Sequence, residues 1–264
     1  MSNLKGKKLF LLDMDGTIYI GDRLFDGARE FIEHVDNIGG RCVFLTNNSS
    51  KSVEDYINKL GGMGIAASSE DFVTSVNATA AHLLENYGGK KIYVFGTSSF
   101  KNQLKAAGIH VVDVAEDGID CLVMGFDTEL TFRKLEDACV LLGKGVDYIA
   151  ANPDWVCPTS YGYVPDCGSV SEMLHRATGR MPLFIGKPKP DMVRIAMDKT
   201  GFSAAETVLI GDRLYTDIAC GNNAGVDTVL VLSGESTARE TEEGEHKPTF
   251  IFEDISKVLE AIKG

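Results

Sequence analysis

Short apolar runs alternate with amphipathic segments along almost the whole chain, and this alternation restricts the possible folds most strongly. The apolar run Leu9–Leu12 is followed by Ala28–Ile38, where apolar residues recur at helical spacing. The run Cys42–Leu45 is followed by a second amphipathic segment that begins at Val53. Strands that alternate with helices in this way are typical of parallel sheets with helices on both faces. The pattern therefore predicts an α/β fold with a doubly wound, Rossmann-like parallel sheet.

The length of 264 residues allows two domains, each with a core of its own. Because the sequence has no internal repeat and no linker rich in Pro and Gly, we expect a second domain to be inserted between strands of the first. The formal net charge is -12, with 26 basic against 38 acidic residues. Such a surface repels polyanions, so we expect no nucleic acid and no membrane as partner.

The sequence has six cysteines but no C-x-x-C pair and no Cys/His cluster. This spacing favours reduced, buried thiols over a disulfide framework or a zinc site. The sequence also shows no apolar signal segment and no run of membrane-spanning length, so we expect a cytoplasmic protein.

Four polar clusters stand directly after predicted strands. They are Asp13 with Asp15, Thr46 with Asn47 and Asn48, Lys187, and Asp212 with Asp217. In open parallel sheets the carboxyl ends of the strands form the ligand crevice. If these strands are neighbours, the four clusters meet at one place.

Each cluster has both a chemical and a structural interpretation. Of two acids spaced like Asp13 and Asp15, one can attack an electrophile or bind a metal while the other moves a proton, or the pair can be a turn with a cap. Thr46 can hold a phosphoryl oxygen with its hydroxyl and backbone N–H, or it can cap the next helix.

The second half of the chain offers complementary charges. Pro188 disfavours helical geometry at Lys187, so this lysine is held extended at a strand end and can neutralise a phosphate, unless it is simply solvated. Asp212 can bind a hard cation such as Mg²⁺. Asp217 can assist it, or can interact with a helix dipole.

Taken together, these motifs resemble the haloacid dehalogenase (HAD) superfamily. Within it, "DMDGTIYIGDRLFDGA", "LTNNSS", "GKPKPDM" and "GDRLYTDIACGNNAG" are similar to the NagD-like, nitrophenylphosphatase-like branch. The motifs occupy residues 13–51 and 186–225, and the alternation of strands and helices extends the resemblance over the whole chain.

The resemblance implies a Mg²⁺-dependent phosphatase. On this interpretation Asp13 is the nucleophile that forms an aspartyl-phosphate, and Asp15 protonates the leaving group and then activates water. Mg²⁺ is held by Asp13, by the Asp15 backbone carbonyl and by Asp212, with Asp217 in support.

The same resemblance implies that Thr46, Asn47 and Lys187 bind the phosphoryl oxygens, and Asn48 is a further candidate for substrate binding. The substrate is expected to be a small phosphorylated metabolite, such as a sugar phosphate or a nucleoside monophosphate, and p-nitrophenyl phosphate is an artificial substrate of the same type.

The resemblance also implies a HAD core domain of residues 1–76 and 183–264, with a large α/β cap domain of residues 77–182 inserted into it. Within the cap, the Pro- and Gly-punctuated segment Asn152–Gly168 is predicted as an irregular loop facing the substrate. Asn152 and Asp154 are the candidate contacts there, and caps of this kind suggest a homodimer.

Three other functions fit part of the pattern. A receiver-like phosphotransfer module also uses an Asp, a Thr, a Lys and Mg²⁺, but it needs about half this length. A glycosyltransferase could use Asp13 and Asp15 to hold a metal, but it would leave Lys187 and Asp212 without a role. A phosphomutase of the same superfamily remains open.

Overall fold

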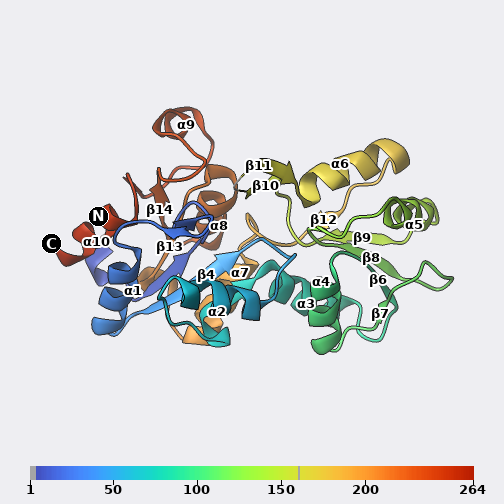
Figure 1. Ribbon diagram of the computed structural model, residues 1–264, viewed down its shortest axis with the longest axis horizontal. Helices are drawn as coiled ribbons and strands as arrows, with labels where there is room; N and C mark the ends of the chain where they lie inside the picture. Colours follow the sequence, from blue (N-terminus) through green and yellow to red (C-terminus); the bar gives the residue numbers. More distant parts are fainter. Residues whose placement is uncertain (1–3, 160) are drawn as a thin grey trace. The chain divides into compact units, whose positions relative to one another are not determined.

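The computed structural model describes residues 4–159 and 161–264, and the chain divides into two compact units. Unit 1 combines the chain up to Thr46 with Val53–Val73 and Lys187–Gly264. Unit 2 combines Asn47–Ser52 with Thr74–Gly186. In Figure 1 the blue start and the red end of the chain therefore belong to unit 1, and the green and yellow middle belongs to unit 2. The inserted domain was predicted as residues 77–182, whereas the long piece of unit 2 spans residues 74–186. Asn47–Ser52 also belongs to unit 2, although the residues on either side of it belong to unit 1.

Unit 1 is built on a six-stranded sheet. Across the sheet the strands are β15 (Phe250–Phe252), β14 (Asp227–Val231), β13 (Thr207–Gly211), β1 (Leu9–Leu12), β4 (Arg41–Thr46) and β5 (Phe72–Thr74). The pairs from β15 to β4 are parallel. Leu12 lies beside Ile210 of β13 and Phe44 of β4, so these three strands end at almost the same level. Whatever follows them meets at one edge of the sheet.

Helices cover both faces of this sheet. On one face α1 (Ala28–Asn37), α2 (Val53–Gly62) and α10 (Ile255–Lys263) pack apolar side chains against alternate residues of the strands. On the other face lie α7 (Asp191–Thr200), which contacts β1, and α8 (Ala219–Ala224), which contacts β14. Because both faces are buried, the central strands read as continuous apolar runs. The remaining elements of unit 1 are η1 (Leu4–Gly6), β2 (Tyr19–Ile20), β3 (Arg23–Leu24), η2 (Ser69–Asp71), η3 (Ala204–Glu206), η4 (Leu214–Ile218) and α9 (Ala238–Glu243).

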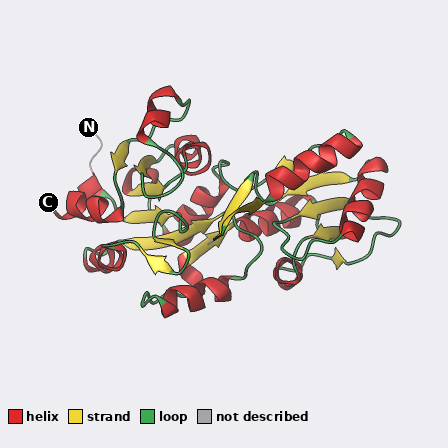
Figure 2. Ribbon diagram, turned by 45° about the horizontal axis from the view of Figure 1, so that its top comes forward, coloured by secondary structure: helices red, strands yellow, loops and turns green. Residues whose placement is uncertain are grey.

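Unit 2 has a parallel sheet of five strands with helices beside it (Figure 2). Across the sheet they are β12 (Leu183–Phe184), β9 (Asp147–Ala150), β8 (Cys121–Met124), β6 (Ile92–Phe95) and β7 (Val111–Val112). The helices are α3 (Ser75–Asn86), α4 (Ser98–Ala106), α5 (Phe132–Gly143) and α6 (Cys167–Thr178). Side chains of α5 and α6 form one apolar cluster with β6, β8 and β9. Unit 2 thus has a core of its own.

The short segment Asn47–Ser52 joins unit 2 through buried polar contacts. The Ser49 hydroxyl accepts a hydrogen bond from the backbone N–H of Phe126 at 2.8 Å. The Thr97 hydroxyl donates to the backbone oxygen of Ser50 at 3.1 Å. These contacts explain why six residues that directly follow a strand of unit 1 belong structurally to unit 2.

The α/β fold with parallel sheets is confirmed, but the segment Asn152–Gly168 is more regular than predicted. Val156–Thr159 (β10) and Gly162–Pro165 (β11) pair as an antiparallel hairpin, and Gly168 already lies in α6. The sequence pattern did not indicate these strands because each contains a proline, Pro158 in β10 and Pro165 in β11. Ser160 lies outside the described residues.

Within the described residues, no helix combines the length and the apolar character needed to cross a membrane.

Candidate active site

Asp13 and Asp15 stand where β1 ends in the middle of the unit 1 sheet. The backbone N–H of Asp13 still bonds to Ile210 O of β13 at 2.9 Å, so the neighbouring strand fixes its position. Asp15 lies in the following turn, which closes when Gly16 N–H donates to Tyr19 O at 2.8 Å. The Asp15 side chain is 40% exposed and the Asp13 side chain only 16%. The first acid is therefore held rigidly, and the second has room to move.

Lys187 is buried between two carboxylates. Its Nζ lies 2.6 Å from Asp13 Oδ1 and 2.6 Å from Asp217 Oδ1, and it donates a third bond to the backbone oxygen of Leu45 at 3.3 Å. Only 3% of the Lys187 side chain is exposed, so solvent screens these charges little. The lysine predicted from its strand-end position thus lies within hydrogen-bonding distance of Asp13.

Asp217 lies in η4, a π-helical turn, whereas the sequence indicated a simple turn before a helix. Its Oδ2 accepts the backbone N–H of Arg213 at 3.1 Å, while its Oδ1 takes Lys187. A Cβ on Gly211 would collide with this carboxylate, so a glycine at the end of β13 makes room for it. Such π-helical turns occur frequently at functional sites.

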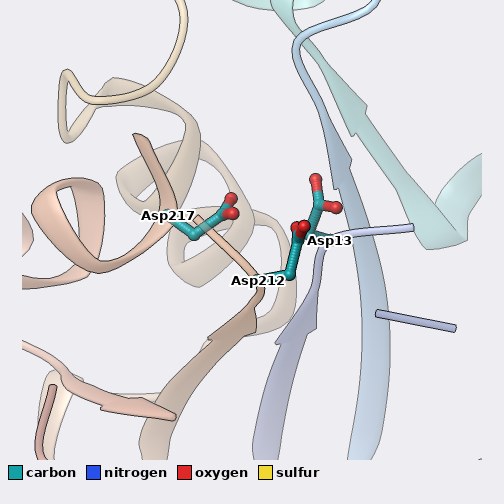
Figure 3. A group of neighbouring side chains, drawn as sticks. All are labelled: Asp13, Asp212 and Asp217. Atoms are coloured by element: carbon teal, nitrogen blue, oxygen red, sulfur yellow. The ribbon is translucent and has the colours of Figure 1, made fainter. Parts of the chain in front are cut away.

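Asp212 follows β13 directly and is buried. Its Oδ2 accepts the backbone N–H of Glu235 at 2.8 Å, but its buried Oδ1 has no hydrogen-bond partner. Oxygens of Asp13, Asp212 and Asp217 lie within 4.8 Å of one another. Figure 3 shows Asp13 and Asp212 together at neighbouring strand ends, with Asp217 turned toward them. Carboxylate oxygens in this arrangement suit a hard divalent cation.

The electrostatics of the cluster reflect three carboxylates around one ammonium group. Burial raises the pKa of Asp212 to about 7, and the nearby Asp217 carboxylate adds to the effect. Burial also raises the pKa of Asp13 well above its usual value, against the opposing effect of Lys187. For Lys187, burial lowers the pKa, but the carboxylates of Asp13 and Asp217 outweigh it and the net direction is upward. The lysine stays charged, and with three carboxylates around it the ionised form of all three is unfavourable unless a cation binds.

Thr46 is the last residue of β4 and is buried. It directly follows Leu45, whose carbonyl accepts a bond from Lys187. The structure therefore brings five predicted residues of unit 1 to one sheet edge along with Asp15. They are Asp13, Thr46, Lys187, Asp212 and Asp217.

The other predicted residues belong to unit 2, where they form a buried polar network. Asn47 Nδ2 donates to Asp154 Oδ1 at 2.9 Å, and Asn152 Nδ2 donates to the backbone oxygen of Asn47 at 2.8 Å. Asn152 is fully buried, and only 6% of Asp154 is exposed. Asn48 is partly buried, and its Oδ1 caps Ser50 N–H at 2.9 Å. The predicted leaving-group contacts Asn152 and Asp154 are thus turned toward Asn47.

Sequence reasoning missed Asp166, which extends this network. Its carboxylate caps the start of α6 by accepting Cys167 N–H at 2.5 Å, and Asn152 Nδ2 lies 3.5 Å away. Burial, reinforced by the charge of Asp154, raises the pKa of Asp166 to about 7. An acid before a predicted helix could have been recognised as a cap, but its burial could not.

Lys59 was also missed, because a lysine within an amphipathic helix pattern is expected to be solvated, whereas only 21% of this side chain is exposed. Its Nζ is 3.8 Å from the centre of the Tyr19 ring and 4.0 Å from Asp15 Oδ1. It therefore places a second positive charge beside Asp15.

Comparison with known proteins gives consistent matches along the whole chain. A family model described as haloacid dehalogenase-like hydrolase matches residues 10–110, and a related HAD-hydrolase-like model matches residues 184–258. The acid sugar phosphatase of Staphylococcus haemolyticus is 35% identical over 263 residues, which cover 100% of this chain and 98% of that protein.

Solved structures show the same relationship. The 4-nitrophenylphosphatase of Thermotoga maritima superimposes with a TM-score of 0.92 at 43% identity and covers 98% of each chain. The glycerol phosphate phosphatase of Mycobacterium tuberculosis, solved in complex with magnesium, has a TM-score of 0.91 at 32% identity. That alignment covers 99% of this chain and 78% of the other. These relatives are all phosphatases, and one of them has been seen with a divalent metal.

Proposed function

The chain belongs to the haloacid dehalogenase-like hydrolases, in the branch of NagD and the nitrophenylphosphatases, and is a phosphoric monoester hydrolase; on this premise we propose that it is a Mg²⁺-dependent phosphatase of small phosphomonoesters. The observation that carries the proposal is the position of Lys187, whose Nζ lies 2.6 Å from Asp13, the proposed nucleophile, and equally close to Asp217.

The residues of the cluster fit a magnesium ion. Asp212 keeps one buried oxygen without a hydrogen-bond partner, which is costly unless a cation binds there. Asp13, Asp212 and the backbone carbonyl of Asp15 would be the ligands, with Asp217 supporting them through Lys187. When bound, Mg²⁺ would offset negative charge on the phosphoryl oxygens.

The proposed reaction proceeds in two displacements. The Asp13 oxygen that Lys187 does not hold attacks phosphorus, so that an O–P bond forms as the bond from phosphorus to the leaving oxygen breaks. The Asp15 carboxyl gives its proton to that leaving oxygen. A water molecule then attacks the aspartyl-phosphate, its proton passes to Asp15, and Asp13 is released with inorganic phosphate.

The remaining residues hold the transferred group. Thr46, with the backbone at Asn47 and Asn48, lies at the carboxyl end of β4, where N–H and hydroxyl groups can bind phosphoryl oxygens. Lys187 contributes a charge that is already fixed before substrate arrives, so no reorganisation is needed during the reaction.

Unit 2 is proposed to act as the cap that selects the substrate. Trp155, Tyr161 and Tyr163 expose 54%, 82% and 66% of their surface on and beside the β10–β11 hairpin. Aromatic faces of this kind can pack against the organic part of an ester. Asn152 and Asp154 would act indirectly, because they hold Asn47. Sugar phosphates, glycerol phosphate and p-nitrophenyl phosphate, named by the relatives, are the first substrates to test.

The deciding experiment uses the purified protein, p-nitrophenyl phosphate and Mg²⁺. Asp13→Asn should keep the fold and lose turnover by orders of magnitude. Mass spectrometry of a rapidly quenched wild-type reaction should find phosphate on the peptide that contains Asp13. Phosphate on another residue would refute the assignment of the nucleophile, and transfer of phosphate to a second position of the substrate would indicate a phosphomutase.

A further inference from the structure

The loop after β14 contacts the proposed metal ligand Asp212 but belongs to none of the motifs described above. The chain here is Ser233-Gly234-Glu235-Ser236. The backbone N–H of Glu235 donates to Asp212 Oδ2 at 2.8 Å, and the N–H of Ser236 donates to the Asp212 backbone oxygen at 3.1 Å. The loop therefore holds both the side chain and the backbone of Asp212.

The same loop also reaches the turn that carries Asp15. The Ser233 hydroxyl donates to the backbone oxygen of Gly16 at 2.7 Å. Ser233, Glu235 and Ser236 thus contact the turns that follow the two neighbouring strands β1 and β13, which supply Asp13 and Asp212. Since one short segment fixes both turns, their relative position depends on it.

Gly234 adds a steric constraint. A Cβ built at this position would collide with the Asp212 carboxylate, closer than real Cβ atoms approach other groups, and the nearest atoms all belong to Asp212. Gly234 is exposed and does not have a positive φ, so neither burial nor backbone conformation requires a glycine here. The space is needed by Asp212 alone.

These contacts leave the two oxygens of Asp212 in different situations. Oδ2 accepts a hydrogen bond and packs against Gly234 and Gly16. A Cβ on Gly16 would lie only 2.5 Å from this oxygen. Oδ1 is buried and has no hydrogen-bond partner. We infer that Ser233, Gly234 and Glu235 are positioning residues that fix Asp212 by one oxygen and so present the other to the divalent cation. The inference rests on the proposed metal dependence.

The experiment measures Mg²⁺ binding itself, by isothermal titration calorimetry and by the Mg²⁺-induced rise in Tm. Gly234→Ala should raise the Kd for Mg²⁺ by about tenfold to a hundredfold, the usual range for groups that orient a metal ligand. Gly61→Ala is the matched control, because a Cβ there meets no atom within 4 Å. Its Kd should equal that of the wild type.

Glu235 allows the backbone contact to be separated from the side chain. Glu235→Pro and Glu235→Ala both remove the ion pair with Arg213, but only proline removes the N–H that bonds to Asp212. We expect the Pro variant to bind Mg²⁺ at least about tenfold more weakly than the Ala variant. If the Pro variant does not fold, Ser233→Ala removes a single hydroxyl and should still raise the Kd several-fold.

Two results would overturn the inference. In the first, Gly234→Ala binds Mg²⁺ as tightly as Gly61→Ala. In the second, Glu235→Pro folds but binds Mg²⁺ as tightly as Glu235→Ala. If Glu235→Pro does not fold, the equivalent result is that Ser233→Ala binds Mg²⁺ as tightly as the wild type. A lower Tm in chelator with an unchanged Kd would assign the loop a purely structural role. If the wild type itself binds no Mg²⁺, the proposed metal dependence fails, and the inference fails with it. If the wild type binds Mg²⁺ and the variants bind it equally well, only the inference fails.

Discussion

Replacing Lys187 by Met should destabilise the protein strongly, and the structure gives the magnitude. The Lys187 side chain is 3% exposed, and its Nζ makes two contacts of 2.6 Å to carboxylates. Removing one partner of a buried ion pair typically costs about 3–5 kcal/mol, because the remaining charge is left without compensation. Met keeps most of the volume of the side chain, so the loss would come from charge and not from a cavity.

The pH dependence of this loss has a definite sign. Burial raises the pKa of Asp13 above its usual 3.8, and Lys187 lowers it, so the Met variant should raise it further. An acid whose pKa is higher in the folded than in the unfolded state destabilises the fold as pH rises between the two values. The deficit of Lys187→Met relative to the wild type should therefore be large at pH 8 and smaller at pH 5.

Urea unfolding followed by circular dichroism at both pH values, in the presence of chelator, would measure this deficit. Lys257→Met is the control, since Lys257 pairs with Glu260 on the exposed side of α10 and should contribute little. If Lys187→Met unfolds at the same urea concentration as the control, or if its deficit grows as pH falls, the electrostatic reasoning is wrong. Turnover should also fall by about a hundredfold to a thousandfold, as when a fixed charge-stabilising group is lost.

Three further predictions concern the network in unit 2 and the metal. The pKa of Asp166 is raised from 3.8 to about 7, so the free energy of unfolding of the wild type should fall as pH rises from 4 to 7. Asp166→Asn should reduce that fall, measured by urea unfolding, by about 2–4 kcal/mol. An unchanged slope would contradict this. Asn47→Ala and Asp154→Ala should show a coupling energy of about 0.5–3 kcal/mol in a double-mutant cycle, and additive effects would mean that their 2.9 Å bond contributes nothing. Chelation should abolish hydrolysis of p-nitrophenyl phosphate and Mg²⁺ should restore it; full activity in excess chelator would exclude metal dependence.

The fold could be predicted from the sequence because it depends on features that are local. The run Leu9–Leu12 was assigned its observed bounds, and Ala28–Ile38 differs by a single residue from α1. Continuous apolar runs are expected where both faces of a strand are covered, and amphipathic spacing where one face of a helix is. The β10–β11 hairpin was missed because Pro158 and Pro165 are unusual in strands.

The residues around the proposed site were predictable only where they follow a strand. Asp13 and Asp212 each stand at such a position, and the parallel register of β1 and β13 brings them together. Lys187 also comes after a strand, but that strand is β12 of the unit 2 sheet, whereas the sequence had suggested a neighbour of β1. Glu235 acts through its backbone N–H and Gly234 through the absence of a side chain, so neither leaves a chemical signature in the sequence. Likewise the burial of Asn152 and Asp154 depends on long-range packing within unit 2.

The membership of Asn47–Ser52 in unit 2 has a consequence for protein engineering. A unit 2 taken from a relative as one continuous insert, equivalent to residues 74–186, would omit the six residues 47–52, three of which bond to Phe126, Thr97 and Asp154. Chimeras that exchange both pieces should fold with native-like cooperativity. Chimeras that exchange only the long piece should fold less cooperatively, because residues 47–52 would then pack against a sequence from another protein. The smallest exchangeable module of this enzyme is therefore discontinuous, and its shorter piece directly follows the strand that ends in Thr46.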